Sequence, residues 1–174
     1  KIDSAAPEAI QIVRESIEKV NPLAIVVDGA SPIKVDDMSL IKGKKVLVVE
    51  DGPTLTHGEM KIGAGIVAAR KFGAAQLVDP RPYITGRLSE TFRLYPEIGT
   101  LLPAMGYGEQ QLRDLEATIN NTSCDSVIIA TPIDLNRIIK INKPSTRVYY
   151  DLQEIGSPNL SEVIDDFVVK FNLK

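Results

Sequence analysis

The chain has 174 residues, of which 44% are hydrophobic and 25% charged, and its net charge is −3. This length allows a sizeable core in one or two domains, and the weak negative charge argues against nucleic-acid binding, which needs clustered basic side chains. The single cysteine, Cys124, excludes an internal disulfide. No apolar run approaches the roughly 20 residues of a membrane span. We therefore expect a cytoplasmic protein that binds neither nucleic acid nor membrane.

Helix and strand signals alternate along the chain. Apolar residues at helical spacing predict helices, and short continuous apolar runs predict strands buried on both faces. In chain order we expect a helix at residues 7–20, strands at 23–27 and 45–49, a helix at 60–72, a strand at 76–78, a helix at 109–120, a strand at 126–130, a helix at 135–141, a strand at 146–152 and a helix at 160–171. This alternation predicts an α/β fold, with a mainly parallel, doubly wound, Rossmann-like sheet and helices on both faces.

Two segments interrupt this pattern. The polar stretch from Lys42 to Lys45 precedes a new strand, and we place a domain boundary there, between residues 1–41 and 42–174. Residues 79–108 are rich in proline, glycine, tyrosine and arginine and have little periodicity. Long loops of this kind in compact domains are usually functional, and we expect this segment to contribute to a binding site.

Acidic residues follow the ends of the predicted strands. They are Asp28, Asp51, Asp79, Asp134 and Asp151. Any one of them could simply cap a following helix. Because doubly wound sheets bind ligands outside the carboxyl ends of their strands, we interpret the set as the rim of a crevice for a phosphorylated or otherwise anionic small molecule.

The stretch VVEDGPTLTHGEM ends a strand in Glu50 and Asp51 and then places His57 beside Thr54 and Thr56. An imidazole among hydroxyls suits phosphate binding or proton transfer, because its pKa lies near neutrality. A surface histidine in a turn is the alternative. We propose Asp51 and His57 as catalytic residues and the two threonines as substrate ligands. One histidine is too few for a zinc site, and we expect no metal bound by this chain.

Arginines and tyrosines recur along the 79–108 segment. Guanidinium groups bind carboxylates and phosphates through two parallel hydrogen bonds. We therefore predict that Arg81, Tyr83 and Arg87 bind substrate together with Asp134; internal ion pairs are the alternative for the arginines.

The stretch GAGIVA at residues 63–68 matches the dinucleotide-binding pattern G-x-G-x-x-A. That pattern requires its first glycine directly after a strand, and here the glycines come later. Close packing of a helix against the sheet explains them better.

Several longer motifs, in this order, resemble the C-terminal half of a family of predicted P-loop GTPases related to cyclic 2,3-diphosphoglycerate synthetase: VLVVEDGPTLTHGEM, GAGIVAARKFGA, LVDPRPY, LLPAMGYG, DLEATIN and TPIDL. The resemblance implies a GTP- or ATP-dependent enzyme that uses Mg²⁺ for phosphoryl transfer or ligation. It also implies that residues 1–41 are the C-terminal remnant of a P-loop nucleotide-binding domain. In that case Asp3 would accept from the guanine ring, Lys1 would lie along it, and the Ala30 and Ser31 backbone would meet its carbonyl.

In this family the phosphate-binding half would precede Lys1, and no G-x-x-x-x-G-K-[ST] motif occurs in the chain. We expect the isolated chain to hold no nucleotide and to be inactive, and the implied partner is the missing P-loop half. Whether it forms a homo-oligomer stays open. Two alternatives also stay open: a regulatory module that binds a metabolite without chemistry, and an interaction protein within a larger assembly.

Overall fold

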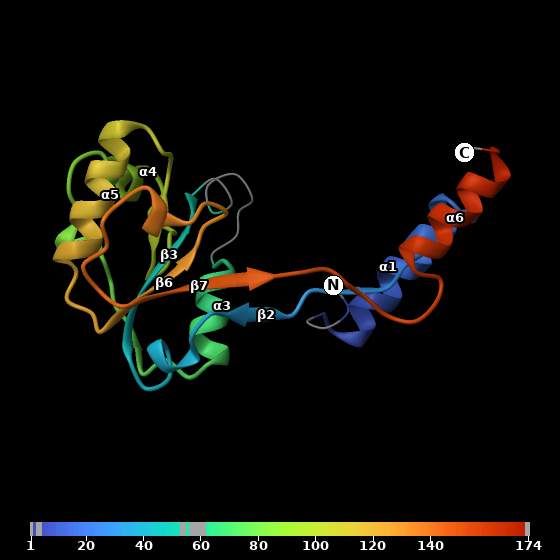
Figure 1. Ribbon diagram of the computed structural model, residues 1–174, viewed down its shortest axis with the longest axis horizontal. Coiled ribbons are helices and arrows are strands. Elements are labelled where there is room, and N and C mark those ends of the chain that lie inside the picture. Colours follow the sequence, from blue (N-terminus) through green and yellow to red (C-terminus); the bar gives the residue numbers. More distant parts are fainter. Residues whose placement is uncertain (1, 3–4, 53–54, 56–61, 173–174) are drawn as a thin grey trace. The chain divides into compact units, whose positions relative to one another are not determined.

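The computed structural model describes residues 2, 5–52, 55 and 62–172. The chain divides into two compact units (Figure 1). We call Lys1–Pro32 together with Tyr150–Lys174 the terminal unit, and Ile33–Tyr149 the sheet unit. Within the described ranges, no helix combines the length and apolarity needed to cross a membrane.

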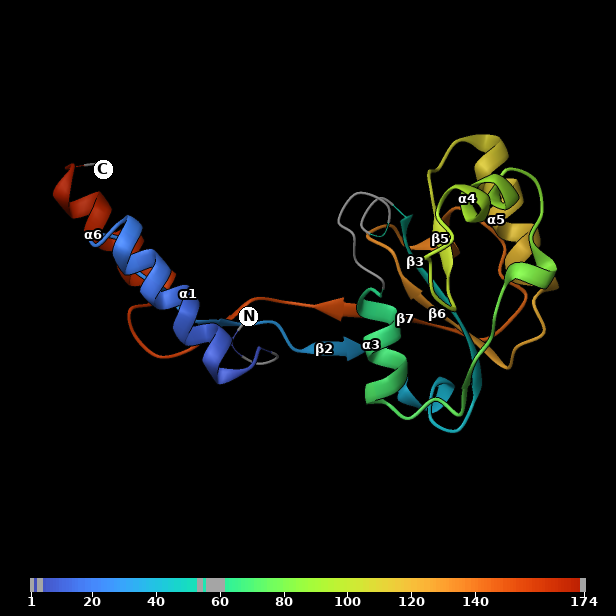
Figure 2. The same ribbon diagram turned by 180° about the vertical axis from the view of Figure 1, so that it is seen from behind.

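A six-stranded sheet organises the sheet unit. Its order is β2 (Ile33–Val35), β7 (Ser145–Tyr150), β6 (Ser126–Ala130), β3 (Lys45–Asp51) and β4 (Gln76–Leu77), and β5 (Leu102–Ala104) also pairs with β3. The strand β3 pairs in parallel with β4, β5 and β6, and β6 pairs in parallel with β7. The arrows of β2 and β7 point in opposite directions in both views (Figures 1 and 2). The mainly parallel α/β sheet predicted from the sequence is confirmed.

The core follows from the apolar runs of the two central strands. Residues 46–49 and 127–129 have no exposed surface, as expected for strands that are covered on both faces. The chain moves from β3 to β4 through α3 (Ala64–Lys71) and from β5 to β6 through α5 (Glu109–Asn121), in opposite directions across the sheet. Because such crossovers are right-handed, the two helices cover opposite faces.

The 79–108 segment is not a structureless loop, contrary to the sequence-based expectation. It contains the 3₁₀ turn η2 (Arg81–Tyr83), the helix α4 (Leu88–Leu94) and the strand β5. These elements are short, so they leave little periodicity in the sequence. They are nevertheless packed, since Leu101 and Leu102 have no exposed surface. This packing brings the end of β5 beside the end of β3.

Two predicted helices differ from their expected bounds, and one further element was not predicted. The helix expected at residues 60–72 is α3, whose N-cap is Gly63; residues 60 and 61 lie outside the described part. The helix expected at residues 135–141 is only the 3₁₀ turn η3 (Leu135–Arg137). A further 3₁₀ turn, η1 (Met38–Leu40), follows β2.

The terminal unit contains α1 (Pro7–Val20), α6 (Leu160–Lys170) and a two-stranded antiparallel ladder of β1 (Gly29–Ala30) and β8 (Gln153–Glu154). The strand predicted at residues 23–27 is not formed. A continuous apolar run becomes a strand only when neighbouring strands supply hydrogen bonds, and the described residues supply none there. The C-terminal segment groups with the N-terminal one, which the sequence pattern did not predict.

Candidate functional site: a small pocket at the end of β5

Glu50 explains the glycines of the GAGIVA stretch. It is 2% exposed, and its Oε1 accepts a hydrogen bond of 2.9 Å from the backbone N–H of Ile66, in the first turn of α3. A Cβ atom on Gly63 would lie 2.3 Å from Glu50 Oε2, and one on Gly65 would lie 2.6 Å from Val48 Cγ1. No side chain fits at either glycine. They permit close helix–sheet packing, as the sequence favoured.

The same contact occupies the N-terminus of α3 with a protein carboxylate. Burial raises the pKa of Glu50 to about 7, although hydrogen bonds from the Ile66, Gly65 and Gly63 amides favour the charged form. A helix N-terminus is a common anion site. Here Glu50 already takes the place that a nucleotide phosphate would need.

The end of β3 contacts the loop that follows β5. A Cβ atom on Gly52 would lie 2.4 Å from Met105 Sδ and 2.7 Å from the Ala104 carbonyl oxygen, so only a glycine allows this approach. Met105 also lines a pocket. Asp51, a predicted catalytic residue, directly precedes Gly52 and therefore lies near this pocket.

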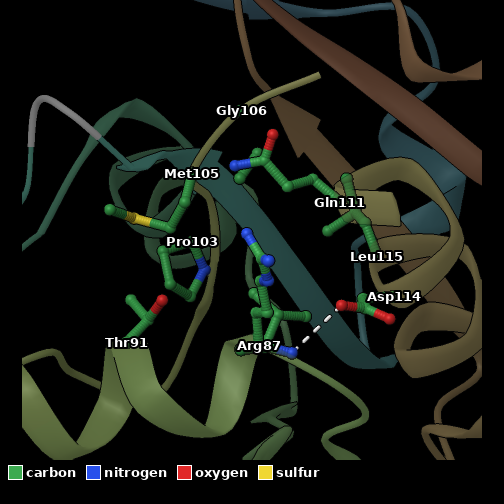
Figure 3. A pocket seen from close by; sticks show the side chains of 10 residues that line it. Arg87, Thr91, Pro103, Met105, Gly106, Gln111, Asp114 and Leu115 are labelled. Carbon is green, nitrogen blue, oxygen red and sulfur yellow. Dashed lines mark hydrogen bonds between the residues drawn. The ribbon is translucent and has the colours of Figure 1, made fainter. Parts of the chain in front are cut away.

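This pocket lies at the carboxyl end of β5, between α4 and α5 (Figure 3). Its volume is about 50 Å³. Because a water molecule needs roughly 10–15 Å³ by this measure, the pocket has room for a group of a few atoms and not for a nucleotide. Its floor is apolar and includes Leu88, Pro103 and Leu115, whereas Arg87, Gln111 and Asp114 contribute polar groups.

Asp114 fixes the backbone on one side of the pocket. Its carboxylate is buried and accepts hydrogen bonds from the Arg87 backbone N–H (3.0 Å) and from Gln110 Nε2 (2.8 Å). Gly86 has φ of +58°, and a Cβ atom there would lie 2.2 Å from Asp114 Cγ. Both the positive φ and the lack of space for a Cβ atom require a glycine at position 86. Asp114 of α5 thus holds the turn that precedes α4.

The guanidinium of Arg87 reaches into this pocket, between Met105 and Gln111 (Figure 3). Within the described part of the chain it forms neither a side-chain hydrogen bond nor an ion pair. Gln111 Oε1 accepts from the Gly108 backbone N–H at 3.1 Å, which leaves the Nε2 donor group facing the pocket. Among the described residues, the Arg87 guanidinium and the Gln111 Nε2 group have no acceptor, and two such donor groups beside a small volume suit a carboxylate or a phosphoryl group.

Arg81 and Tyr83, also predicted to bind substrate, lie outside the lining of this pocket. Arg81 Nη1 donates to Asp79 Oδ1 at 3.0 Å, and its guanidinium lies over the Phe92 ring, 4.7 Å from the centroid. These are the internal contacts that the sequence left open as the alternative. Tyr83 is half-buried in η2. Anion binding by either residue stays a prediction.

A second polar cluster follows the end of β6. Asp134 caps η3 by accepting from the Asn136 backbone N–H at 3.1 Å, and its carboxylate lies 3.9 Å from Arg147 Nη1. Among the described residues, the Arg147 Nε and the Tyr107 hydroxyl are buried without a hydrogen-bond partner. Burial raises the pKa of Tyr107, and the charge of Asp51 adds to this shift.

Sequence reasoning missed the functional potential of several of these residues. Arg147 had a usable signal, because a charged residue inside an apolar strand run is unusual. Gln111 and Asp114 had none, since both look like the polar face of an amphipathic helix.

Other predicted site residues are placed only in part. His57, Thr54, Thr56, Lys1 and Asp3 lie outside the described residues. In the terminal unit, Ala30 is buried in β1 and Ser31 follows it directly. The described ranges contain no group of three or more histidine, cysteine, aspartate or glutamate residues that could hold a metal ion.

The fold is that of an α/β domain, and it carries a small pocket lined by Arg87, Gln111 and Asp114. No family model matches the chain. Among curated proteins, Arginine synthetase ArcE of Thermococcus kodakarensis is 60% identical over 167 residues, which cover 96% of this chain and 37% of that protein. The chain therefore spans little more than a third of its relative's length.

The matched part is the C-terminal part of that larger protein. The likeness supports the expectation that this sequence corresponds to the C-terminal part of a larger enzyme. It does not by itself support the resemblance to the cyclic 2,3-diphosphoglycerate synthetase family.

Proposed function

We propose that this chain acts as the C-terminal part of a nucleotide-dependent ligase that forms arginine or a close analogue, and that the Arg87 pocket holds an anionic group of the substrate. The observation that carries this proposal is the 60% identity, over 96% of the chain, to an enzyme named as an arginine synthetase. An amino-acid substrate has an α-carboxylate, which matches the donor groups and the size of the pocket.

Each pocket residue has a distinct part in this binding. Arg87 pairs with the carboxylate or phosphoryl oxygens, and Gln111 Nε2 donates a further hydrogen bond. Asp114 does not touch the ligand; it holds the Arg87 backbone N–H at 3.0 Å and so positions the guanidinium. The apolar floor reduces competition from water, which strengthens a charged hydrogen bond.

The energy source in this proposal is ATP or GTP with Mg²⁺. The described residues do not fit a nucleotide, because the pocket is only about 50 Å³ and Glu50 fills the N-terminus of α3. We therefore assign nucleotide binding to the part of the larger enzyme that this chain does not span. Asp51, at the neighbouring end of β3, keeps its proposed catalytic role. His57 keeps the same proposed role and lies outside the described residues.

The same pocket would serve the phosphoryl transfer implied by the resemblance to cyclic 2,3-diphosphoglycerate synthetase-related GTPases. Carboxylate and phosphoryl groups both accept two parallel hydrogen bonds from arginine, so the pocket alone favours neither reaction. The arginine-forming reaction is favoured by the identity to the synthetase.

A chimera tests the proposed function. This chain would replace the matching segment of the Thermococcus enzyme, and arginine formation would be measured with ATP or GTP and Mg²⁺. We expect the chimera to form arginine. A folded chimera without this activity would refute the proposed reaction, and arginine binding by the chain without turnover would favour a regulatory module.

Two arginines of the α4 region supply a matched pair of variants in the chimera. Arg87→Ala should raise the KM for the anionic substrate by about tenfold, equivalent to roughly 1.4 kcal/mol. Arg93→Ala is the control, because Arg93 has a side chain that is 71% exposed and contacts only Glu90 at 3.7 Å among the described charges. An unchanged KM in Arg87→Ala would remove this pocket from substrate binding.

A further inference from the structure

Residues 23–27, Leu-Ala-Ile-Val-Val, form an apolar run of which three side chains are exposed. Leu23 and Ile25 are 91% and 59% exposed. Val26 is 38% exposed, and together with Ala24 it lines a groove that the run shares with α1. Since successive side chains of an extended chain point to opposite faces, Leu23 and Ile25 leave one apolar face of the run uncovered, and Val26 leaves the other only partly covered.

Most of the backbone amides of the same run also lack hydrogen-bond partners in the described chain. Of its amides, the described contacts satisfy only that of Ala24, which donates to the Asn21 carbonyl at 3.0 Å. A continuous apolar run of this kind is typical of parallel strands buried on both faces. The run at residues 46–49 of the sheet unit has no exposed surface at all.

The helices of the terminal unit also present uncovered apolar faces. No described residue of α1 or α6 is buried. On α6, one stripe at helical spacing consists of Leu160, Ile164, Phe167 and Phe171, each between 48% and 55% exposed. A stripe with this period is the face by which a helix packs against other elements. The unpaired backbone of residues 23–27, the exposed side chains of that run and the apolar stripe of α6 are therefore all left without a covering element in the described chain.

We propose that a second α/β polypeptide completes the terminal unit by pairing a parallel strand with residues 23–27 and covering the apolar faces of the run and of α6. Its identity follows from the match to the arginine synthetase, of which 63% (100% minus 37%) lies outside the matched part. The occupant is a polypeptide homologous to that remainder, in the same chain or as a separate subunit.

A second copy of this chain fits the run less well. Two copies related by a twofold axis pair the same strand with itself in antiparallel direction, whereas runs that are apolar on both faces belong to parallel sheets. The inference uses the length of the relative and not its reaction. It would stand even if the chimera failed to form arginine.

Co-expression tests the inference. The chain would be produced together with the remaining 63% (100% minus 37%) of the Thermococcus protein, and the complex analysed by size exclusion with light scattering and by amide hydrogen exchange. We expect a 1:1 complex in which the amides of residues 25–27 exchange on the order of 100-fold more slowly than in the chain alone.

Two substitutions of similarly exposed apolar residues provide the comparison. Ile25→Asp should weaken the complex by at least about tenfold, because it places a charge in the new interface. Leu94→Asp, at a position 56% exposed in the sheet unit, should leave the affinity unchanged. Circular dichroism melts of both variants establish that they fold. The proposal is overturned if folded partners do not associate, if residues 25–27 stay unprotected in the complex, or if the chain alone forms a dimer that protects them.

Discussion

The buried carboxyl of Glu50 gives the chain a stability that falls as pH rises. Its pKa is raised from 4.5 to about 7, and burial of the carboxyl is the largest cause. The folded state therefore binds the proton more tightly than the unfolded state does, and the contribution is complete below about pH 4.5. It declines as pH rises and is lost once pH passes about 7. The rise of the Glu50 pKa from 4.5 to about 7 corresponds to about 3 kcal/mol of unfolding free energy.

The assay is urea denaturation between pH 4.5 and 8, followed by circular dichroism, for the wild-type chain and for Glu50→Gln. The amide has nearly the same shape but does not titrate, so the difference between the two proteins isolates Glu50 from every other group. Asp37 and Glu162 do not interfere, because hydrogen bonds lower their pKa values and they titrate in more acidic solution. We expect the difference in unfolding free energy between the two proteins to change by about 3 kcal/mol across this range. A difference that is independent of pH would refute the account of Glu50.

Three further predictions follow from the packing and the pocket. Gly65→Ala should lower the unfolding free energy by about 1–3 kcal/mol, because the new Cβ would lie 2.6 Å from Val48 Cγ1 and 2.9 Å from Ala130 Cβ; an unchanged urea midpoint would show that α3 can shift freely. Calorimetry should show that Arg81→Ala weakens binding of a phosphorylated ligand by roughly 1.5–3 kcal/mol, whereas a lower melting temperature with unchanged affinity would assign Arg81 to its contact with Phe92. The purified chain should hydrolyse neither ATP nor GTP, and turnover that survives controls for contaminants would contradict the assignment of the nucleotide to another polypeptide.

The sequence by itself determined the sheet and its central strands. Runs such as residues 46–49 and 127–129 are apolar on every side, and only a strand buried on both faces satisfies such a run. The spacing of GAGIVA after β3 also sufficed to favour packing over cofactor binding, because a phosphate-binding turn must directly follow its strand. These conclusions depend on neighbours in the chain, which a sequence displays.

Tertiary structure alone decided which arginine faces the pocket. Arg81 and Arg87 are the same residue type in the same predicted segment, but the first is engaged by Asp79 and the Phe92 ring, and the second lines the pocket. Gln111 and Asp114 gained their importance only when α5 was brought against the turn before α4. Contacts between distant segments have no local signature in the chain.

Residues 23–27 show where local sequence stops determining the structure and tertiary contacts begin to decide it. Their β-branched apolar pattern predicts a strand, and Leu23, Ile25 and Val26 are exposed instead of buried between neighbouring elements. The strand is nevertheless not formed in the described chain. Local sequence sets the propensity of a segment to be extended, but a strand exists only where a second backbone accepts and donates its hydrogen bonds.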